Sequence, residues 1–176
     1  MFRVRASGHD RSKRMSMSAQ DVESMAKADT APYVTFSLAD ETYAIDVLQV
    51  QEVLKVSDIA PVPGVPDYIL GIINLRGNVV TVIDARRRMG LEDREPDDAS
   101  RIVIIDVDDQ NVGILVDSVS EVVRISPDSV EAAPEVGNDE SSRFIQGVTS
   151  TEAGLTILVD LNKLLSDEEW AQLREL

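Results

Sequence analysis

The sequence of 176 residues contains no cysteine and only one histidine. Disulfide bonds, thiolate nucleophiles and metal sites built from Cys and His are therefore excluded or nearly so. The single histidine, His9, lies in an N-terminal stretch without an apolar period, where a catalytic base is not expected. Neither a glycine-rich phosphate loop nor a nucleophile elbow is present. These absences disfavour an enzyme and predict a protein without a cofactor.

Long apolar runs are also missing from the chain. No stretch approaches the roughly 20 apolar residues that a membrane-spanning helix requires, and the N-terminus lacks the apolar centre of a signal peptide. The sequence therefore predicts a cytoplasmic protein with no direct membrane insertion.

Basic residues are scarce, with 17 Lys and Arg against 32 Asp and Glu, and the net charge is −15. A surface of this charge repels phosphate backbones, so nucleic-acid binding is not expected. Two explanations of the acidity stay open. One is a cytosol at high salt, where carboxylates keep a protein hydrated, and the other is an ordinary acidic protein.

Two carboxylate-rich segments, 93–98 (DREPDD) and 106–109 (DVDD), invite a search for metal or hydrolase chemistry. Neither has the spaced ligands and glycine of an EF-hand loop, and both lie where turns are expected, so we predict no metal site. A hydrolase that uses two carboxylates stays open and requires two acids about 5–9 Å apart in a cleft. The basic run 85–90 (ARRRMG) is either a solvated helix face or a contact for an acidic partner.

The organisation of the chain changes near Tyr33. Residues 1–31 lack an apolar period and are predicted to form a disordered leader, whereas residues 32–176 are predicted to fold as one domain. From Tyr33 onward the chain consists of short β-branched runs broken by turn signals, which is typical of small antiparallel barrels or a sandwich. The long amphipathic helices that parallel crossovers require are missing.

One helix stands out at the C-terminus, over about residues 167–175. Ser166 and Glu169 have the spacing of a capping box at its start. The only tryptophan, Trp170, is predicted to anchor this helix to the β-structure.

The chain also matches itself at two offsets. At an offset of 69, residues 39–54 lie on a later segment without a gap, and at an offset of 76 residues 69–89 do the same. The order of the matches is preserved, so we interpret the chain as two similar β-units packed against each other. Their approximate bounds are 33–90 and 101–165.

The stretch INLRGNVVTVID, residues 73–84, is predicted to form a β-hairpin. Gly77-Asn78 suits a two-residue type II′ turn, which places Asn74 opposite Thr81. Strict alternation then separates a core face from a face that is polar toward the tip. The core face comprises Ile73, Leu75, Val80 and Val82.

Arg76 lies at the polar end of this hairpin. Its guanidinium is costly to bury without a partner, so it is expected at the rim or matched to an acceptor. It is either a solvated turn residue or a contact for another protein. The second unit carries Glu152 at the corresponding position, so the hairpin itself does not require an arginine, which favours the partner contact.

Four segments together resemble the CheW family of chemotaxis coupling proteins. In order they are YAIDVLQVQEVL (43–54), PGVPDYILGIINLRGNVVTVIDAR (63–86), VGILVDSVSEVV (112–123) and ILVDLNKLL (157–165). The similarity covers nearly everything from Tyr33 to the C-terminus, and the Asn-Leu-Arg-Gly signature of the family is intact at 74–77.

The resemblance implies a mainly β fold of two packed, SH3-like, five-stranded barrels with short connecting helices and a C-terminal helix. It also implies a non-catalytic adaptor that links the cytoplasmic hairpin tips of chemoreceptors to the regulatory domain of the histidine kinase CheA in membrane-associated arrays. In the family, the groove between the barrels takes the receptor hairpin and the barrel ends pair with the kinase. The positions that match the binding residues of the family are Val50, Glu52, Gly71, Asn74, Leu75, Arg76, Gly77, Gly113, Val119 and Val122. A barrel that binds a small ligand or peptide, with no part in chemotaxis, remains the alternative.

The two explanations of the acidity make different predictions about salt. If the carboxylates are an adaptation to high salt, the melting temperature should rise as KCl approaches molar concentration, because screening relieves the repulsion among acidic groups. A thermal melt across a KCl series measures this directly. A melting temperature that gains nothing at molar KCl would leave the protein as an ordinary acidic one.

Overall fold

The computed structural model describes residues 29–132 and 143–176. Most of the predicted leader, residues 1–31, therefore lies outside the described residues. The described part contains ten strands, which are β1 (Ala31–Leu38), β2 (Glu41–Asp46), β3 (Val50–Lys55), β4 (Ile69–Leu75), β5 (Asn78–Asp84), β6 (Arg101–Val107), β7 (Gln110–Val116), β8 (Ser118–Ile125), β9 (Ile145–Thr151) and β10 (Gly154–Val159). The helical elements are short, namely η1 (Val47–Gln49), α3 (Ala85–Arg88), η2 (Pro127–Ser129), η4 (Leu161–Lys163) and α4 (Asp167–Arg174).

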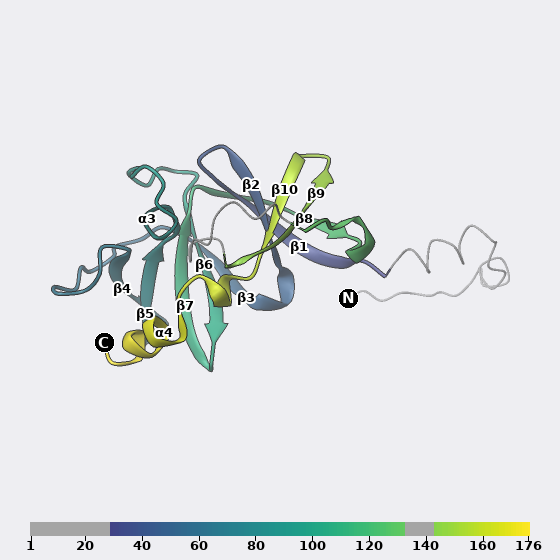
Figure 1. Ribbon diagram of the computed structural model, residues 1–176. Helices are drawn as coiled ribbons and strands as arrows, with labels where there is room; N and C mark the ends of the chain where they lie inside the picture. Colours follow the sequence, from purple (N-terminus) through teal and green to yellow (C-terminus); the bar gives the residue numbers. More distant parts are fainter. Residues whose placement is uncertain (1–28, 133–142) are drawn as a thin grey trace, which may run out of the picture.

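The strands form two five-stranded sheets that lie side by side (Figure 1). One sheet, barrel A, has the strand order β8-β1-β2-β10-β9, and the other, barrel B, has the order β3-β6-β7-β5-β4. The pairs are antiparallel except for β2 with β10 and β5 with β7, which are parallel. The predicted fold class, two packed, SH3-like, five-stranded barrels, is confirmed.

The internal repeat follows the strands in order. The offset of 69 places β2 on β7 and β3 on β8, and the offset of 76 places β4 on β9 and β5 on β10. The barrels nevertheless do not coincide with the two units, which corrects the expected picture of one unit packed against the other. Barrel A takes two strands from the first half and three from the second, and barrel B takes the reverse. A sequence offset records the order of similar strands, whereas the parallel pairs that join the two halves are tertiary contacts.

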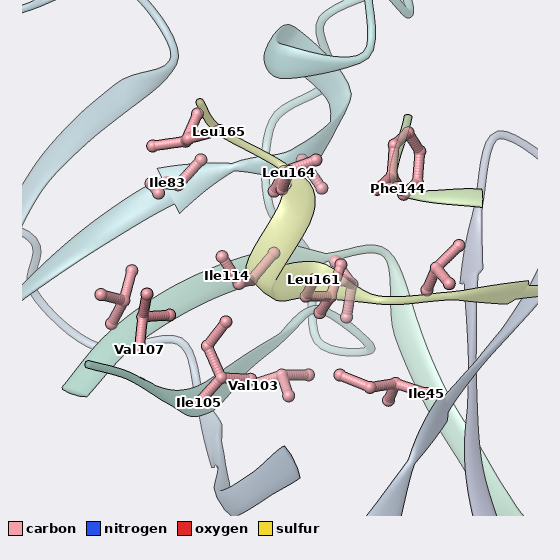
Figure 2. Packing of buried hydrophobic residues seen from close by; sticks show 14 of the residues in the cluster. Ile45, Ile83, Val103, Ile105, Val107, Ile114, Phe144, Leu161, Leu164 and Leu165 are labelled. Carbon is pink, nitrogen blue, oxygen red and sulfur yellow. The ribbon is translucent and has the colours of Figure 1, made fainter. Parts of the chain in front are cut away.

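The largest hydrophobic cluster lies between the barrels rather than inside either of them. It joins residues of β1, β2 and β10 in barrel A to residues of β5, β6 and β7 in barrel B. Figure 2 shows Ile45 of β2 and Leu161 of η4 close to Val103 and Ile105 of β6. Separate, smaller clusters fill the interior of each barrel.

The sequence of strand β6, RIVIIDV, is apolar almost without interruption because both faces of the strand are buried. Ile102 and Ile104 point into barrel B, and Val103 and Ile105 point toward barrel A. All four side chains are fully buried. A strand with both faces buried loses the alternation that marks a half-exposed strand.

The C-terminal helix α4 begins and packs as predicted. Ser166 accepts a hydrogen bond from the Glu169 amide at 3.1 Å, and the Glu169 carboxylate accepts one from the Ser166 amide at 2.8 Å, so the capping box is confirmed. Trp170 is buried in the inter-barrel cluster and donates its indole N–H to the carbonyl of Asn162 at 2.7 Å. The tryptophan therefore anchors the helix to the body of the protein.

The basic run 85–90 is not a free cationic patch, because each of its three arginines pairs with a carboxylate of the protein, although Arg87 is exposed. Arg86 is buried and donates two hydrogen bonds to Asp117, at 2.8 and 2.7 Å. Burial by itself raises the pKa of Asp117, but the bonds from Arg86 and from the Ala39 amide lower it below its usual value. Arg88 pairs with Glu169 of α4 and lies over the ring of Tyr68. The run therefore fastens α3 to β7 and to α4 within the protein.

Two glycines that match each other in the repeat, Gly71 and Gly147, are required for the same structural reason, which is the close approach of a backbone carbonyl. A Cβ atom at Gly71 in β4 would lie 2.1 Å from the carbonyl oxygen of Ala60, and one at Gly147 in β9 would lie 2.7 Å from that of Glu131. Both carbonyls belong to isolated bridges, Ala60 with Ile72 and Glu131 with Val148. A backbone that is fixed by such hydrogen bonds cannot retreat from an added methyl group.

The substitution Gly71→Ala should therefore lower the free energy of unfolding by at least about 2 kcal/mol, because the added methyl overlaps a fixed carbonyl. Gly147→Ala should be destabilising to a smaller extent, because its approach is less close. Urea denaturation of the two variants and the wild type measures both effects. A Gly71→Ala protein as stable as the wild type would show that the bridge at Ala60 is not fixed.

Candidate binding surface

The hairpin around Arg76 has a different register from the predicted one. Asn74 pairs with Val79 and Leu75 with Asn78, so the turn consists of Arg76 and Gly77 instead of Gly77-Asn78. Both turn residues have positive φ, 51° and 86°, which is the geometry of a type I′ turn. The Asn74 side chain accepts a hydrogen bond from the Gly77 amide at 2.9 Å, and this side-chain cap favours the shifted turn.

The corrected register keeps the predicted faces, because it moves the partner of each residue by two positions along β5. Ile73, Val80 and Val82 are buried inside barrel B, with Leu75 packed against them. Asn74 and Arg76 are exposed. The opposite face is also buried at its base, since Ile83 belongs to the inter-barrel cluster.

Arg76 forms an ion pair with Glu52 of β3. The guanidinium donates two hydrogen bonds to the carboxylate, one of them 3.0 Å long from Nη1 to Oε1. The side chain of Arg76 remains 69% exposed, and that of Glu52 is 28% exposed. The hydrogen bond from Arg76, together with its charge, lowers the pKa of Glu52, and Glu52 in turn raises the pKa of Arg76. The pair is therefore ionised at neutral pH.

This ion pair spans the seam of barrel B. β3 and β4 are the two outer strands of its sheet, and β3 does not pair with β4. The Ala60–Ile72 bridge closes one part of the seam, and Arg76 reaches across another part to Glu52. Val79, which pairs with Asn74 across the hairpin, is 69% exposed. Val53 follows Glu52 in β3 and lies on the other face of that strand, 38% exposed. We call Glu52, Asn74, Arg76 and Val79 the Arg76 surface.

The valines predicted to bind a partner separate into two groups. Val50 at the start of β3 and Val119 in β8 are half-buried and pack against the inter-barrel cluster. Val122, three residues further along β8, is 59% exposed and lines a groove between β8 and β9. The structure therefore brings Val50 and Val119 to the junction of the barrels and leaves Val122 on the outside of barrel A.

The predicted glycines differ in accessibility. Gly71 and Gly113 are buried, and a Cβ atom at Gly113 would lie 2.7 Å from Cγ2 of Ile102. These two positions are covered by the packing of barrel B and are not open to a partner. Gly77 is exposed in the turn next to Arg76.

Sequence reasoning named both Glu52 and Arg76 but did not connect them. They are 24 residues apart, Glu52 on β3 and Arg76 in the turn after β4, and these two strands do not pair, so no periodicity links the two residues. It also missed the groove between β8 and β9. The internal repeat was the sequence signal that relates the ion pair to the groove. At the two offsets Glu52 corresponds to Glu121 and Arg76 to Glu152, and both of these glutamates line the groove.

Within residues 29–132 and 143–176, no group of three or more His, Asp or Glu side chains is arranged to hold a metal ion. Of the helices in the described part of the chain, none has the length and apolar character needed to cross a membrane.

The hydrogen bond from the Gly77 amide gives Asn74 a structural part in the turn that is separate from binding. Asn74→Ala should lower the free energy of unfolding by about 0.5–1.5 kcal/mol, the usual net contribution of one hydrogen bond. Asn78→Ala is the matched control, since the Asn78 side chain makes no hydrogen bond within the described part of the chain. Chemical denaturation compares the two variants, and equal effects would show that the Asn74 cap contributes nothing.

The chain is similar to proteins of a known family. A family profile described as the CheW-like domain matches residues 32–169. The chain is 33% identical over 147 residues to the chemotaxis protein CheW of Treponema pallidum, covering 81% of this chain and 86% of that protein. It is 37% identical over 135 residues to CheW of Bacillus subtilis, covering 77% and 86%.

A solved structure gives the same result for the fold. The scaffolding protein TtCheW from Thermoanaerobacter tengcongensis has a TM-score of 0.72 and 37% identity to this chain, covering 80% of this chain and 95% of that one. The solved structure agrees with the fold of two barrels, and the profile and the relatives agree with it on the family. The chain belongs to the CheW family of chemotaxis coupling proteins.

Proposed function

We propose that this protein is a non-catalytic adaptor that couples the cytoplasmic hairpin tips of chemoreceptors to the regulatory domain of the histidine kinase CheA. Its membership of the CheW family supports the adaptor function. The observation that carries the assignment of a binding surface is the Arg76–Glu52 ion pair, which is exposed and lies at the intact family signature. In this proposal the protein is cytoplasmic and works within receptor arrays at the membrane.

We assign the Arg76 surface to the receptor. Arg76 holds a charge that is rare on this acidic chain, and its guanidinium keeps most of its surface open to solvent while paired with Glu52. An exposed cation with the exposed Val79 in the same hairpin suits a helix with an apolar stripe and an acidic or polar group beside it. Val50 and Val119, at the junction of the barrels, extend the apolar part of this contact.

We assign the outer ends of the barrels to the kinase, whose regulatory domain is itself similar to CheW. Each contact needs very roughly 600–800 Å² per partner to hold as a weak and reversible joint. An array contains many such joints, so modest single affinities add through multivalency. Reversible joints allow the receptor to alter kinase activity without dissociating the array.

Reversal of the charge at position 76 tests the receptor assignment. Arg76→Glu should lower the affinity for a receptor hairpin fragment at least about tenfold, which corresponds to about 1.4 kcal/mol. The melting temperature should change little, because an exposed ion pair contributes little to stability. Binding is measured by co-sedimentation with the hairpin fragment, and separately with the CheA regulatory domain.

Two further variants distinguish a direct contact between Arg76 and the receptor from a structural role of Arg76 in barrel B. Glu52→Gln removes the ion pair and keeps the arginine, so receptor binding should be largely retained. The charge swap Glu52→Arg with Arg76→Glu rebuilds an ion pair across the seam but removes the cation from position 76. If the swap restores receptor binding, Arg76 acts only by bracing the barrel and the assignment is wrong.

A further inference from the structure

A groove of about 650 Å³ opens in barrel A between β8 and β9. These are the two outer strands of the sheet, so β8 pairs with β1 alone and β9 with β10, apart from the Glu131–Val148 bridge. Residues 121–126 of β8 and the following turn form one wall, and residues 149–152 of β9 and its turn form the other. The groove is the open seam of barrel A.

This seam is the counterpart of the one that Arg76 spans in barrel B. β8 corresponds to β3 and β9 to β4, and the Glu131–Val148 bridge corresponds to the Ala60–Ile72 bridge. At the same offsets, Glu121 stands in the place of Glu52 and Glu152 in the place of Arg76. The same architecture is therefore closed by an ion pair in one barrel and lined by two carboxylates in the other.

The two carboxylates have no cation of their own. Within the described residues, neither the Glu121 nor the Glu152 side chain forms a hydrogen bond or an ion pair, and both residues are exposed. Arg124 also lines the groove, but its guanidinium is bonded to Thr30, through Nε to the hydroxyl and through Nη2 to the carbonyl, each at 2.8 Å. These bonds leave Arg124 charged, so the two carboxylates and one guanidinium that line the groove give it a net charge of −1, and neither carboxylate is paired with the guanidinium.

Two apolar side chains are exposed near this seam. Val122 in the wall of the groove is 59% exposed. Leu155, which pairs with the groove residue Ser150 across the β9–β10 hairpin, is 60% exposed. At the two offsets these apolar residues correspond to Val53 and Val79, so barrel A keeps the glutamate and the apolar residues but lacks the arginine, and it has Ser150 in place of the asparagine.

We propose that the β8–β9 groove is a second protein-binding surface that accepts an arginine of a partner protein, which takes the place that Arg76 holds in barrel B. The arginine lies between Glu121 and Glu152, and apolar side chains next to it in the partner rest on Val122 and Leu155. The inference goes beyond the proposed function, because it concerns barrel A and holds whether or not Arg76 contacts a receptor.

The Arg76–Glu52 ion pair in barrel B indicates which chemical group of a partner would bind in the β8–β9 groove. In barrel B a guanidinium already binds the equivalent carboxylate with two hydrogen bonds, a geometry that an ammonium group does not reproduce. A metal ion is a poorer match, since the described residues hold no group of three acidic or histidine ligands. A partner that brings an arginine also neutralises part of the charge of −15.

The first experiment closes the groove from within. Glu152→Arg should form an ion pair with Glu121 like the one between Arg76 and Glu52, so the pKa of Glu121 should fall, as measured by carboxyl ¹³C NMR. Glu152 is exposed in a turn, so the variant should fold, and the amide spectrum checks this. An unchanged pKa of Glu121 would show that the two positions do not face each other as their counterparts do.

The second experiment uses the full chain, labelled with ¹⁵N, and the probe peptide acetyl-Leu-Arg-Leu-amide. The peptide should shift the amide signals of residues 121–126 and 149–152. Its citrulline analogue, which keeps the shape but not the charge, should bind at least about tenfold more weakly. Glu152→Arg should abolish binding, Glu152→Gln should weaken it, and Asp106→Arg, with the same charge change on the exposed face of β6, should leave it intact.

Three results would overturn the proposal. The first is equal affinity for the arginine and citrulline peptides, and the second is full binding by the Glu152→Arg variant. The third is a dimer that grows with concentration and dissociates in Glu152→Arg, because the occupant would then be a second copy of this chain. None of these results depends on the receptor co-sedimentation that tests Arg76, so the two proposals fail separately.

Discussion

The hydrophobic contact between the two barrels is the constraint on which the rest of the structure depends. The largest cluster of buried side chains lies there, and it draws on strands from both halves of the chain as well as on α4. The interior of each barrel is small by comparison, particularly in barrel A, where the cluster centres on Ala44, Ile125 and Leu158. The largest share of the buried apolar side chains therefore depends on the contact between the barrels. How the two barrels pack consequently fixes the position of the proposed binding surfaces relative to each other.

The strands are shared unequally between the halves of the chain. β1 and β2 join β8–β10 in barrel A, whereas barrel B is formed from the continuous stretch β3–β7. Every strand pair of the described residues lies within one barrel, so the junction is held by the hydrophobic cluster and by the two chain connections, β2 to β3 and β7 to β8. The arrangement suits an adaptor of the CheW family, because a partner bound to one barrel is held in a fixed orientation to a partner bound to the other.

The few basic residues of this acidic protein have mostly structural uses. Arg86 is buried against Asp117, and Arg88 joins α3 to Glu169 and Tyr68. Burial and the neighbouring Glu169 raise the pKa of Tyr68 to about 12, so the tyrosine stays neutral as part of this contact. Arg76 differs from the other two because its guanidinium is mostly exposed while paired. The two seams therefore differ at one position. Arg76 closes the seam of barrel B by pairing with Glu52, whereas the corresponding residue in barrel A is Glu152 and that seam is open.

The sequence by itself determined the class of fold, the duplicated order of strands, the capped C-terminal helix and the family, because these depend on local patterns. Alternation, turn residues, a capping box at Ser166 and a short signature at 74–77 are all read over a few neighbouring residues. Only the tertiary structure decided which strands share a barrel, that the turn lies at Arg76-Gly77, and that Arg76 meets Glu52. The turn escaped prediction because the Asn74 side chain, not the glycine position alone, selects its type. The ion pair escaped prediction because Glu52 lies on the outer strand β3 and Arg76 in the turn after the other outer strand, β4. These elements come together only when the sheet closes into a barrel, and no sequence period records that closure.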